Sequence, residues 1–154
     1  MKVVVIDDDP TGSQTVNNCL LLLKWDYSTL VQSFKSKYNL FFILANTRSL
    51  SEKEAKLRLE EICNVLKEIT SKELFKEPLI VISRGDSTLR GHNYLEPNII
   101  NECLGPFDAT FHIPAFIEAK RFTIDGIHYV DNIPVSQTIF AKDKIFGFET
   151  SNIK

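Results

Sequence analysis

The sequence predicts an α/β fold with a mostly parallel sheet, helices on both faces and a C-terminal β-hairpin. Three observations carry this prediction: short β-branched runs that end at polar loops, helically periodic segments between them, and two alternating segments around an Asp-Gly pair. At 154 residues, with 44% hydrophobic and 25% charged residues, the chain has the size and composition of one globular domain.

Five short apolar runs are predicted to be strands. The first is Lys2–Ile6, a β-branched run that ends at three aspartates, which is typical of a buried parallel strand. Residues 79–82 (Leu-Ile-Val-Ile) give the clearest interior strand. The remaining predicted strands are residues 19–23, 40–44 and 110–113.

Three helices are predicted between these strands. Ser51 and Glu54 form a capping box, and an apolar stripe at steps of four and three residues follows it as far as Ile69. A second helix is predicted for residues 93–104 with Pro97 in its first turn, and a third for residues 27–37. Alternating strands and helices predict a Rossmann-like three-layer arrangement whose ligand site lies beyond the carboxyl ends of the strands.

A hairpin is predicted near the C-terminus. Residues 121–124 and 127–130 alternate in polarity and flank Asp125-Gly126, the preferred pair for a type I′ turn.

Charge and apolar content limit the classes of partner. A net charge of −2 gives no broad basic surface, so we expect no nucleic acid as partner. The N-terminal apolar run, residues 3–6, is too short for a signal peptide or membrane span, and we expect a cytoplasmic protein without membrane contact. The three cysteines are widely spaced, which favours thiols in the core.

The first polar loop, residues 7–12, follows the first strand directly. Three adjacent carboxylates repel one another unless a cation, hydroxyl groups or arginines offset their charge. Thr11 supplies a hydroxyl group, and Pro10 and Gly12 form a tight turn that lets backbone amides approach a ligand. The alternative is a solvated acidic turn in which one aspartate caps a helix.

The second polar loop, residues 83–92, follows the run at 79–82. Arginine forks bind planar carboxylates and aspartate accepts hydrogen bonds from sugar hydroxyls, so this loop suits a polyhydroxy acid. The alternative is that its arginines pair with aspartates and its hydroxyls act as caps. Its candidate binding residues are Arg84, Asp86, Ser87, Thr88, Arg90 and Gly91.

A third segment, residues 114–121, leads into the hairpin and carries Glu118 and Arg121. His128 alternates with two apolar neighbours, as an outward-facing polar residue of a strand would. His92 and His112 lack partners at metal-ligand spacing, so we expect no metal site.

Five motifs in order resemble the four-carbon acid sugar kinase family, formerly a domain of unknown function. They are Asp-Asp-x-Thr-Gly at residues 8–12, Asn-Thr-Arg-Ser at 46–49, Asp-Ser-Thr-Leu-Arg-Gly-His at 86–92, Pro-Ala-Phe at 114–116 and Asp-Gly-x-His-Tyr-Val at 125–130. The resemblance covers nearly the whole chain. It implies the substrate-binding N-terminal domain of a two-domain, ATP-dependent kinase for sugar acids such as erythronate and threonate.

The resemblance implies that Asp8, Asp9, Arg84, Asp86 and Arg90 face the sugar acid, with Glu118 and Arg121 near the same cleft. We expect the arginines to bind the carboxylate, the aspartates to orient hydroxyl groups, and Asp8 or Asp86 to act as the catalytic base. The full predicted binding set is Asp9, Thr11, Gly12, Arg84, Ser87, Thr88, Arg90, Gly91, Glu118 and Arg121. Where the family usually has a glycine before the last arginine, this chain has Lys120.

The family's ATP-binding half is expected to follow this segment or to be a separate chain, because no Gly-rich phosphate loop is present here. ATP and Mg²⁺ are therefore expected for the complete enzyme, whereas this chain alone should bind the acid without phosphorylating it. A homodimer is compatible with the sequence, which does not determine the oligomeric state.

Two rival functions remain. Asp7, Asp9 and Thr11 fit the D-x-D-x-T signature of haloacid-dehalogenase-like phosphatases, with Asp7 as nucleophile and Mg²⁺ as its charge partner, although no later acidic pair completes that site. The chain could also be a non-catalytic sugar-acid-binding remnant.

Overall fold

The computed structural model describes residues 1–71, 75 and 77–154, and the chain divides into two compact units. We call the first, Met1–Arg84 with Tyr94–Asp108, the sheet unit. The second, Gly85–Asn93 with Ala109–Lys154, is the hairpin unit.

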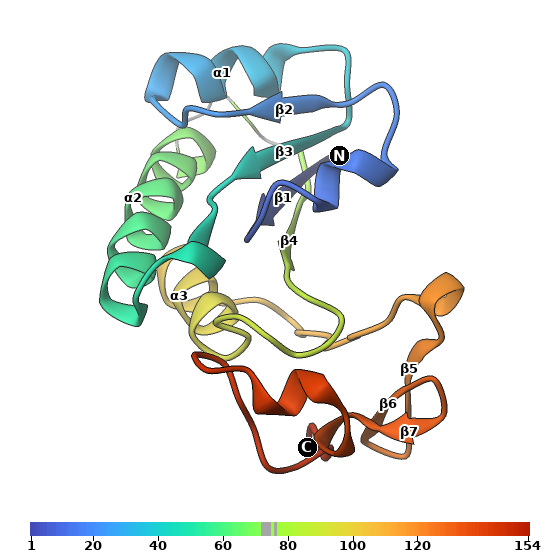
Figure 1. Ribbon diagram of the computed structural model, residues 1–154. Coiled ribbons are helices and arrows are strands. Elements are labelled where there is room, and N and C mark those ends of the chain that lie inside the picture. Colours follow the sequence, from blue (N-terminus) through green and yellow to red (C-terminus); the bar gives the residue numbers. More distant parts are fainter. Residues whose placement is uncertain (72–74, 76) are drawn as a thin grey trace. The chain divides into compact units, whose positions relative to one another are not determined.

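The sheet unit contains a four-stranded parallel sheet in the order β2-β3-β1-β4 (Figure 1). The strands are β1 (Lys2–Asp7), β2 (Leu20–Leu22), β3 (Leu40–Leu44) and β4 (Leu79–Arg84). The four predicted strands in this part of the chain are confirmed, and β3 has its predicted bounds. The predicted α/β class with a parallel sheet is confirmed with them.

All three predicted helices are present. They are α1 (Tyr27–Lys35), α2 (Glu52–Ser71) and α3 (Leu95–Leu104). The predicted capping box begins α2: the Ser51 backbone nitrogen donates to Glu54 Oε2 at 3.0 Å, and the Glu54 nitrogen donates to Ser51 Oγ at 3.4 Å. Pro97 lies in the first turn of α3, where a missing backbone N–H costs no helical hydrogen bond.

One core lies between the sheet and the three α-helices. Side chains alternate along a strand, so Val4 and Ile6 of β1 share a face with their partners Phe41 and Ile43 of β3. This face packs against buried residues of every α-helix, among them Leu30 of α1, Leu59 and Ile62 of α2, and Ile99 and Ile100 of α3.

The helices share this face because the connections from β2 to β3 and from β3 to β4 cross the sheet in the same direction. The connection from β1 to β2 runs in the opposite direction and carries a 3₁₀ helix, η1 (Gly12–Thr15). It approaches the other face of the sheet, where Gly12 lies against the Asp7 side chain.

The edge position of β4 corrects the expectation of an interior strand. β4 pairs with β1 on one side, and Ile80 and Ile82 are 45% and 42% exposed. An apolar run indicates how much its side chains can bury, but it does not determine how many neighbouring strands the backbone has.

The hairpin unit contains a three-stranded antiparallel sheet of β5 (Arg121–Ile124), β6 (Ile127–Val130) and β7 (Ile133–Pro134). The predicted hairpin is confirmed with its predicted bounds. Asp125 and Gly126 have φ angles of 52° and 84°, as a type I′ turn requires. The other 3₁₀ helices of the described chain are η2 (Thr47–Ser49), η3 (Ile117–Ala119), η4 (Val135–Gln137) and η5 (Ile139–Lys142).

The predicted strand at residues 110–113 is wrong. These residues adopt no regular structure, and Phe111 and Ile113 are 82% and 76% exposed. A segment with high strand propensity forms a strand only where a neighbouring backbone supplies hydrogen bonds. This segment has no such neighbour in the described structure.

The predicted core position of the cysteines holds for Cys63, which is buried, but Cys19 and Cys103 are only half-buried; all three are free thiols. Across the residues described, no helix is both long and apolar enough to cross a membrane.

Candidate functional site

Three neighbouring strands of the sheet unit have their carboxyl ends on the same side of the sheet. β1 ends at Asp7, β4 ends at Arg84, and η2, which carries Arg48, follows β3. The Asp8 backbone nitrogen donates to the Arg84 carbonyl oxygen at 3.1 Å, and the Arg48 nitrogen donates to the Asp8 carbonyl oxygen at 3.1 Å. Parallel pairing thus brings together the first loop and two arginines that are far from it in sequence. We call Asp7, Asp8, Asp9, Arg48 and Arg84 the Asp–Arg cluster.

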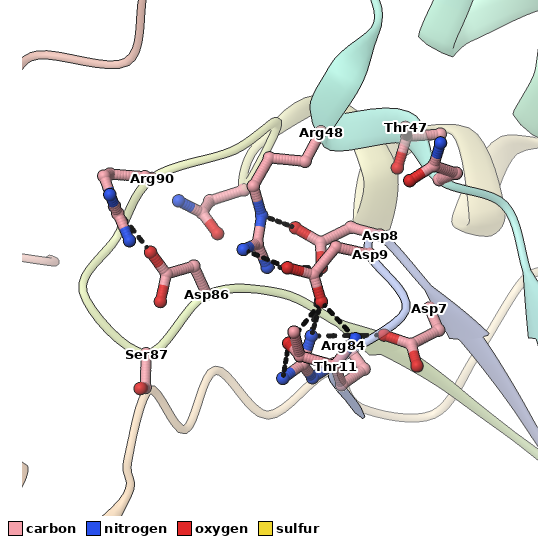
Figure 2. A network of polar contacts seen from close by, with 12 residues as sticks. Asp7, Asp8, Asp9, Thr11, Thr47, Arg48, Arg84, Asp86, Ser87 and Arg90 are labelled. Atoms are coloured by element: carbon pink, nitrogen blue, oxygen red, sulfur yellow. Dashed lines mark hydrogen bonds and ion pairs between the residues drawn. The ribbon is translucent and has the colours of Figure 1, made fainter. Parts of the chain in front are cut away.

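Arg48 binds two of the aspartates through all three guanidinium nitrogens (Figure 2). Its Nε and Nη2 donate to the two carboxylate oxygens of Asp8 at 2.8 and 2.7 Å, which is the bidentate geometry of strong ion pairs. Its Nη1 donates to Asp9 Oδ2 at 2.5 Å. Arg48 was not among the predicted site residues; its only signal was the Asn-Thr-Arg-Ser motif after the third apolar run.

Arg84 lies among all three carboxylates of the cluster. Its Nη1 is 3.2 Å from Asp7 Oδ1, 3.4 Å from Asp8 Oδ1 and 2.8 Å from Asp9 Oδ1. Its Nη2 donates to Thr11 Oγ1 at 3.3 Å. Arg84 therefore pairs with aspartates in this structure, as the alternative interpretation of the second polar loop expected.

Burial and neighbouring charges shift the pKa values of the three aspartates in different directions. Burial raises the pKa of Asp7 to about 6, although the Arg84 guanidinium opposes this shift. Burial also raises the pKa of Asp8, against the hydrogen bonds and charge of Arg48. Burial acts in the same direction on Asp9, but hydrogen bonds from Thr11 and the positive charge of Arg48 outweigh it and lower the pKa of Asp9.

The side chains of the three aspartates also differ in their exposure to solvent. The Asp7 side chain is fully buried, and its Oδ2 has no hydrogen-bond partner among the described residues. The Asp9 side chain is 18% exposed and is the most accessible carboxylate of the cluster. Oxygen atoms of the three carboxylates lie within 4.8 Å of one another, and the neighbouring positive charge comes from the two arginines. The expectation of no metal site stays a prediction.

The turn after the aspartates is closely packed. The Thr11 backbone nitrogen donates to Asp9 Oδ1 at 2.9 Å, and the Thr11 hydroxyl donates to the same oxygen. A Cβ atom at Gly12 would lie 2.5 Å from Asp7 Oδ1 and 2.7 Å from Arg84 Nε. Glycine is therefore required here by the close approach of the carboxylate and the guanidinium.

A buried glutamate behind the cluster was missed by the sequence analysis. Glu96, in the first turn of α3, is 2% exposed and accepts hydrogen bonds from the hydroxyls of Thr47 at 2.6 Å and Ser83 at 2.9 Å. A charged residue in a helical segment is usually a surface residue, so sequence alone gave no signal for this position.

The hairpin unit contains a second group of predicted residues around Asp86. The Asp86 carboxylate accepts hydrogen bonds from the Thr88 hydroxyl and backbone nitrogen. It also accepts one from Arg90 Nε at 2.7 Å (Figure 2). Burial acts to raise the pKa of Asp86, but the Thr88 and Arg90 hydrogen bonds outweigh it and lower the pKa. Gly91 has a φ of 126°, a conformation that favours glycine.

Arg121 belongs to the same group. Its Nη1 donates to Ser87 Oγ at 2.9 Å and lies 3.9 Å from Asp86 Oδ1, and its buried Nε has no hydrogen-bond partner among the described residues. Phe140, which sequence analysis did not select, lies 5.6 Å from the Arg121 guanidinium and 5.1 Å from that of Arg90. We call Asp86, Ser87, Arg90, Arg121 and Phe140 the Asp86 cluster.

His128 is fully buried, which corrects the expectation of an outward-facing residue. Its Nε2 is 2.7 Å from the Ser87 carbonyl oxygen, and its Nδ1 is 3.0 Å from Thr123 Oγ1. A carbonyl oxygen can only accept, so Nε2 carries the proton. Burial lowers the pKa of His128, and the neutral ring holds the Ser87 backbone in place.

The third predicted segment contributes less. Glu118 is exposed in η3, and no described residue forms an ion pair or hydrogen bond with its carboxylate. Lys120 has a φ of 51°, so the family's usual glycine at this position is explained by a left-handed backbone. The Lys120 side chain is 68% exposed and pairs with Asp131 at 2.9 Å.

Three comparisons relate the chain to known proteins. A family model described as "Sugar-binding N-terminal domain" matches residues 3–154. A D-erythronate kinase from Heliobacterium modesticaldum is 28% identical over 148 residues, a match that covers 92% of this chain and 32% of that protein. The chain thus spans about a third of the length of this curated relative.

Two crystal structures of a domain of unknown function from Bordetella bronchiseptica have the same fold, with TM-scores of 0.73 and 0.76 and identities of 20% and 21%. Each match covers 99% of this chain and 38% or 39% of the other. Both are described as domain-swapped dimers with bound citrate. From the family match over residues 3–154, the motifs and the shared fold, the chain belongs to the sugar-binding N-terminal domains of the four-carbon acid sugar kinase family.

Proposed function

We propose that this chain binds a four-carbon sugar acid, of the erythronate or threonate type, as the substrate-binding part of an ATP-dependent kinase. The observation that carries the proposal is the pair of aspartate and arginine clusters in the loops whose motifs define the family resemblance. The D-erythronate kinase relative supports the choice of substrate class.

The two clusters offer complementary chemistry to a hydroxylated acid. In the Asp–Arg cluster, carboxylates outnumber guanidiniums, and the partly exposed Asp9 can accept a hydrogen bond from a sugar hydroxyl. In the Asp86 cluster, two arginines face one buried aspartate, and Arg121 Nε lacks a hydrogen-bond partner in the described structure. We propose that Asp9 accepts a hydrogen bond from a hydroxyl group of the acid and that Arg90 and Arg121 bind its carboxylate.

Asp8 is the better candidate for the catalytic base than Asp86. A base at neutral pH is more effective when its pKa is raised toward the working pH. Burial raises the pKa of Asp8, whereas hydrogen bonds from Thr88 and Arg90 lower that of Asp86. Binding of the substrate would have to displace part of the Arg48 contact to free the Asp8 carboxylate.

ATP and Mg²⁺ belong to the complete enzyme in this proposal: the nucleotide would supply the phosphoryl group, and Mg²⁺ would neutralise its charge. The remaining two thirds of the D-erythronate kinase relative would correspond to the nucleotide-binding part, either in the same chain or in a partner. We expect this chain alone to bind the acid without phosphorylating it. A cytoplasmic location and a homodimer complete the proposal, the latter supported by the dimers in the two crystal structures of the Bordetella bronchiseptica protein.

Calorimetric titration of the purified chain with D-erythronate and with both threonate enantiomers tests the proposal. Losing a charge-assisted hydrogen bond costs about 1.5–3 kcal/mol, so we expect Arg90→Ala and Asp9→Asn each to weaken binding by about 10- to 100-fold. Lys53→Ala, at an exposed position on α2, is the control and should bind as the parent does.

Each other result argues against a part of the proposal. A response to Arg90→Ala but not to Asp9→Asn would limit the acid to the Asp86 cluster. Mg²⁺-dependent release of phosphate from phosphorylated erythronate without nucleotide would favour the phosphatase alternative. Binding of the acid with no ATP-dependent phosphorylation by the full-length protein would favour the non-catalytic alternative.

A further inference from the structure

We propose that Glu96 is a positioning residue whose buried carboxylate fixes the two segments that carry Arg48 and Arg84. It thereby orients both guanidiniums toward the three aspartates of the Asp–Arg cluster. The inference rests on the proposed function only for its effect on substrate binding.

The carboxylate joins two segments that are distant in sequence. Glu96 Oε1 accepts a hydrogen bond from the Thr47 hydroxyl at 2.6 Å, and Oε2 accepts one from the Ser83 hydroxyl at 2.9 Å. Thr47 is fully buried and Glu96 is 2% exposed. Thr47 immediately precedes Arg48, and Ser83 immediately precedes Arg84. Each oxygen of one carboxylate therefore holds the residue next to one of the two arginines.

Anchoring at these two residues controls where the guanidiniums can reach. Consecutive Cα atoms are about 3.8 Å apart, so fixing one residue fixes the origin of the next side chain. The Arg48 guanidinium must then meet Asp8 and Asp9, and Arg84 Nη1 must stay between 2.8 and 3.4 Å from three carboxylates. Small shifts of either origin would break this arrangement.

A buried carboxylate is an energetically unfavourable contact between a helix and a sheet. Transfer of a charged group out of water costs free energy, whereas burial of an apolar side chain is favourable. The position of Glu96 in the first turn of α3 lowers this cost, since the helix N-terminus favours negative charge. Two hydroxyl donors lower it further. An apolar residue would suffice for packing alone, so we assign the carboxylate to positioning.

The pKa of Asp7 separates positioning from a direct charge effect, because the two act with opposite signs. Removing the negative charge of Glu96 would by itself lower the pKa of Asp7. Losing the position of Arg84 would raise it, since Arg84 lowers this pKa while Asp8 and Asp9 raise it. The pKa of the Asp7 carboxyl group can be followed by carbon-detected NMR between pH 4 and pH 9.

We expect Glu96→Ala to raise the pKa of Asp7 by about one unit, because the arginine is no longer anchored. Glu96→Gln keeps an oxygen acceptor for one hydroxyl and can donate to the other, so it should leave the pKa equal to or below the parent value. If Glu96→Ala does not fold, the double variant of Thr47→Val and Ser83→Ala serves instead. It keeps the Glu96 carboxylate, removes both anchors and should also raise the pKa of Asp7.

Binding of D-erythronate is measured on the same proteins. We expect at least a tenfold loss in Glu96→Ala and recovery of most of the affinity in Glu96→Gln. An Asp7 pKa that falls equally in both variants would overturn the positioning role. If the parent chain does not bind the acid, the proposed function fails, while the NMR result still decides the role of Glu96.

Discussion

Replacing Asp7 by asparagine should make the protein more stable at high pH, because the native state buries an ionised carboxylate there. Asp7 is fully buried, and its Oδ2 has no hydrogen-bond partner among the described residues. Its Oδ1 lies 3.2 Å from Arg84 Nη1, and the same nitrogen also contacts Asp8 and Asp9. The substitution keeps the size of the side chain and removes the charge. Functional sites often contain groups that lower the stability of the fold, so replacing such a group can make a protein more stable.

The magnitude follows from the pKa of Asp7, which burial raises from 3.8 to about 6 against the attraction of Arg84. Because the folded pKa is above the unfolded one, the native state binds this proton more tightly. The resulting stability is fully present below the unfolded pKa and is lost as the pH rises through about 6. The complete loss is about 3 kcal/mol, of which about 1.4 kcal/mol falls between pH 5 and pH 8.

Urea denaturation of the parent and of Asp7→Asn at pH 5 and pH 8 measures this difference. The free energy of unfolding of the parent should fall by about 1.4 kcal/mol relative to the variant over this interval. Asp108→Asn, the same substitution at an exposed position, controls for the exchange itself. A difference that is the same at both pH values would refute the reasoning, because burial of Asp7 would then carry no penalty for ionisation.

Three further predictions concern single residues. Phe140→Leu removes two cation–π contacts and should weaken sugar-acid binding about tenfold by calorimetry, whereas Phe111→Leu, at an 82% exposed position, should not change it. Gly12→Ala places a Cβ 2.5 Å from the Asp7 carboxylate and should lower the free energy of unfolding by about 1–3 kcal/mol; an unchanged urea midpoint would show that the turn can move. Ser51→Ala removes the cap of α2 and should cost about 1 kcal/mol in the same assay, and no loss would mean that water replaces the hydroxyl.

The sequence predicted those parts of the site that depend on local order. A β-branched run that ends at Asp7 predicts a strand with a polar loop at its carboxyl end, and this holds for β1. The Asp-Gly pair predicts the hairpin turn because only a few residues tolerate two successive positive φ angles. The same local argument failed at residues 110–113, where strand propensity met no neighbouring strand in the described structure.

The amino-acid sequence by itself determined the α/β class, the parallel strands, the α2 cap, the hairpin and the two loops that carry the aspartates and arginines. These features depend on periodicity, turn chemistry and spacing, which act over a few residues. Only the tertiary structure decided that Arg48 contacts the first loop, that Glu96 is buried and binds the hydroxyls of Thr47 and Ser83, and that β4 is an edge strand. The contacts that set strand order and burial join residues far apart in the sequence, such as Asp8 and Arg48, 40 positions apart, and Thr47 and Glu96, 49 positions apart. No local pattern determines those contacts.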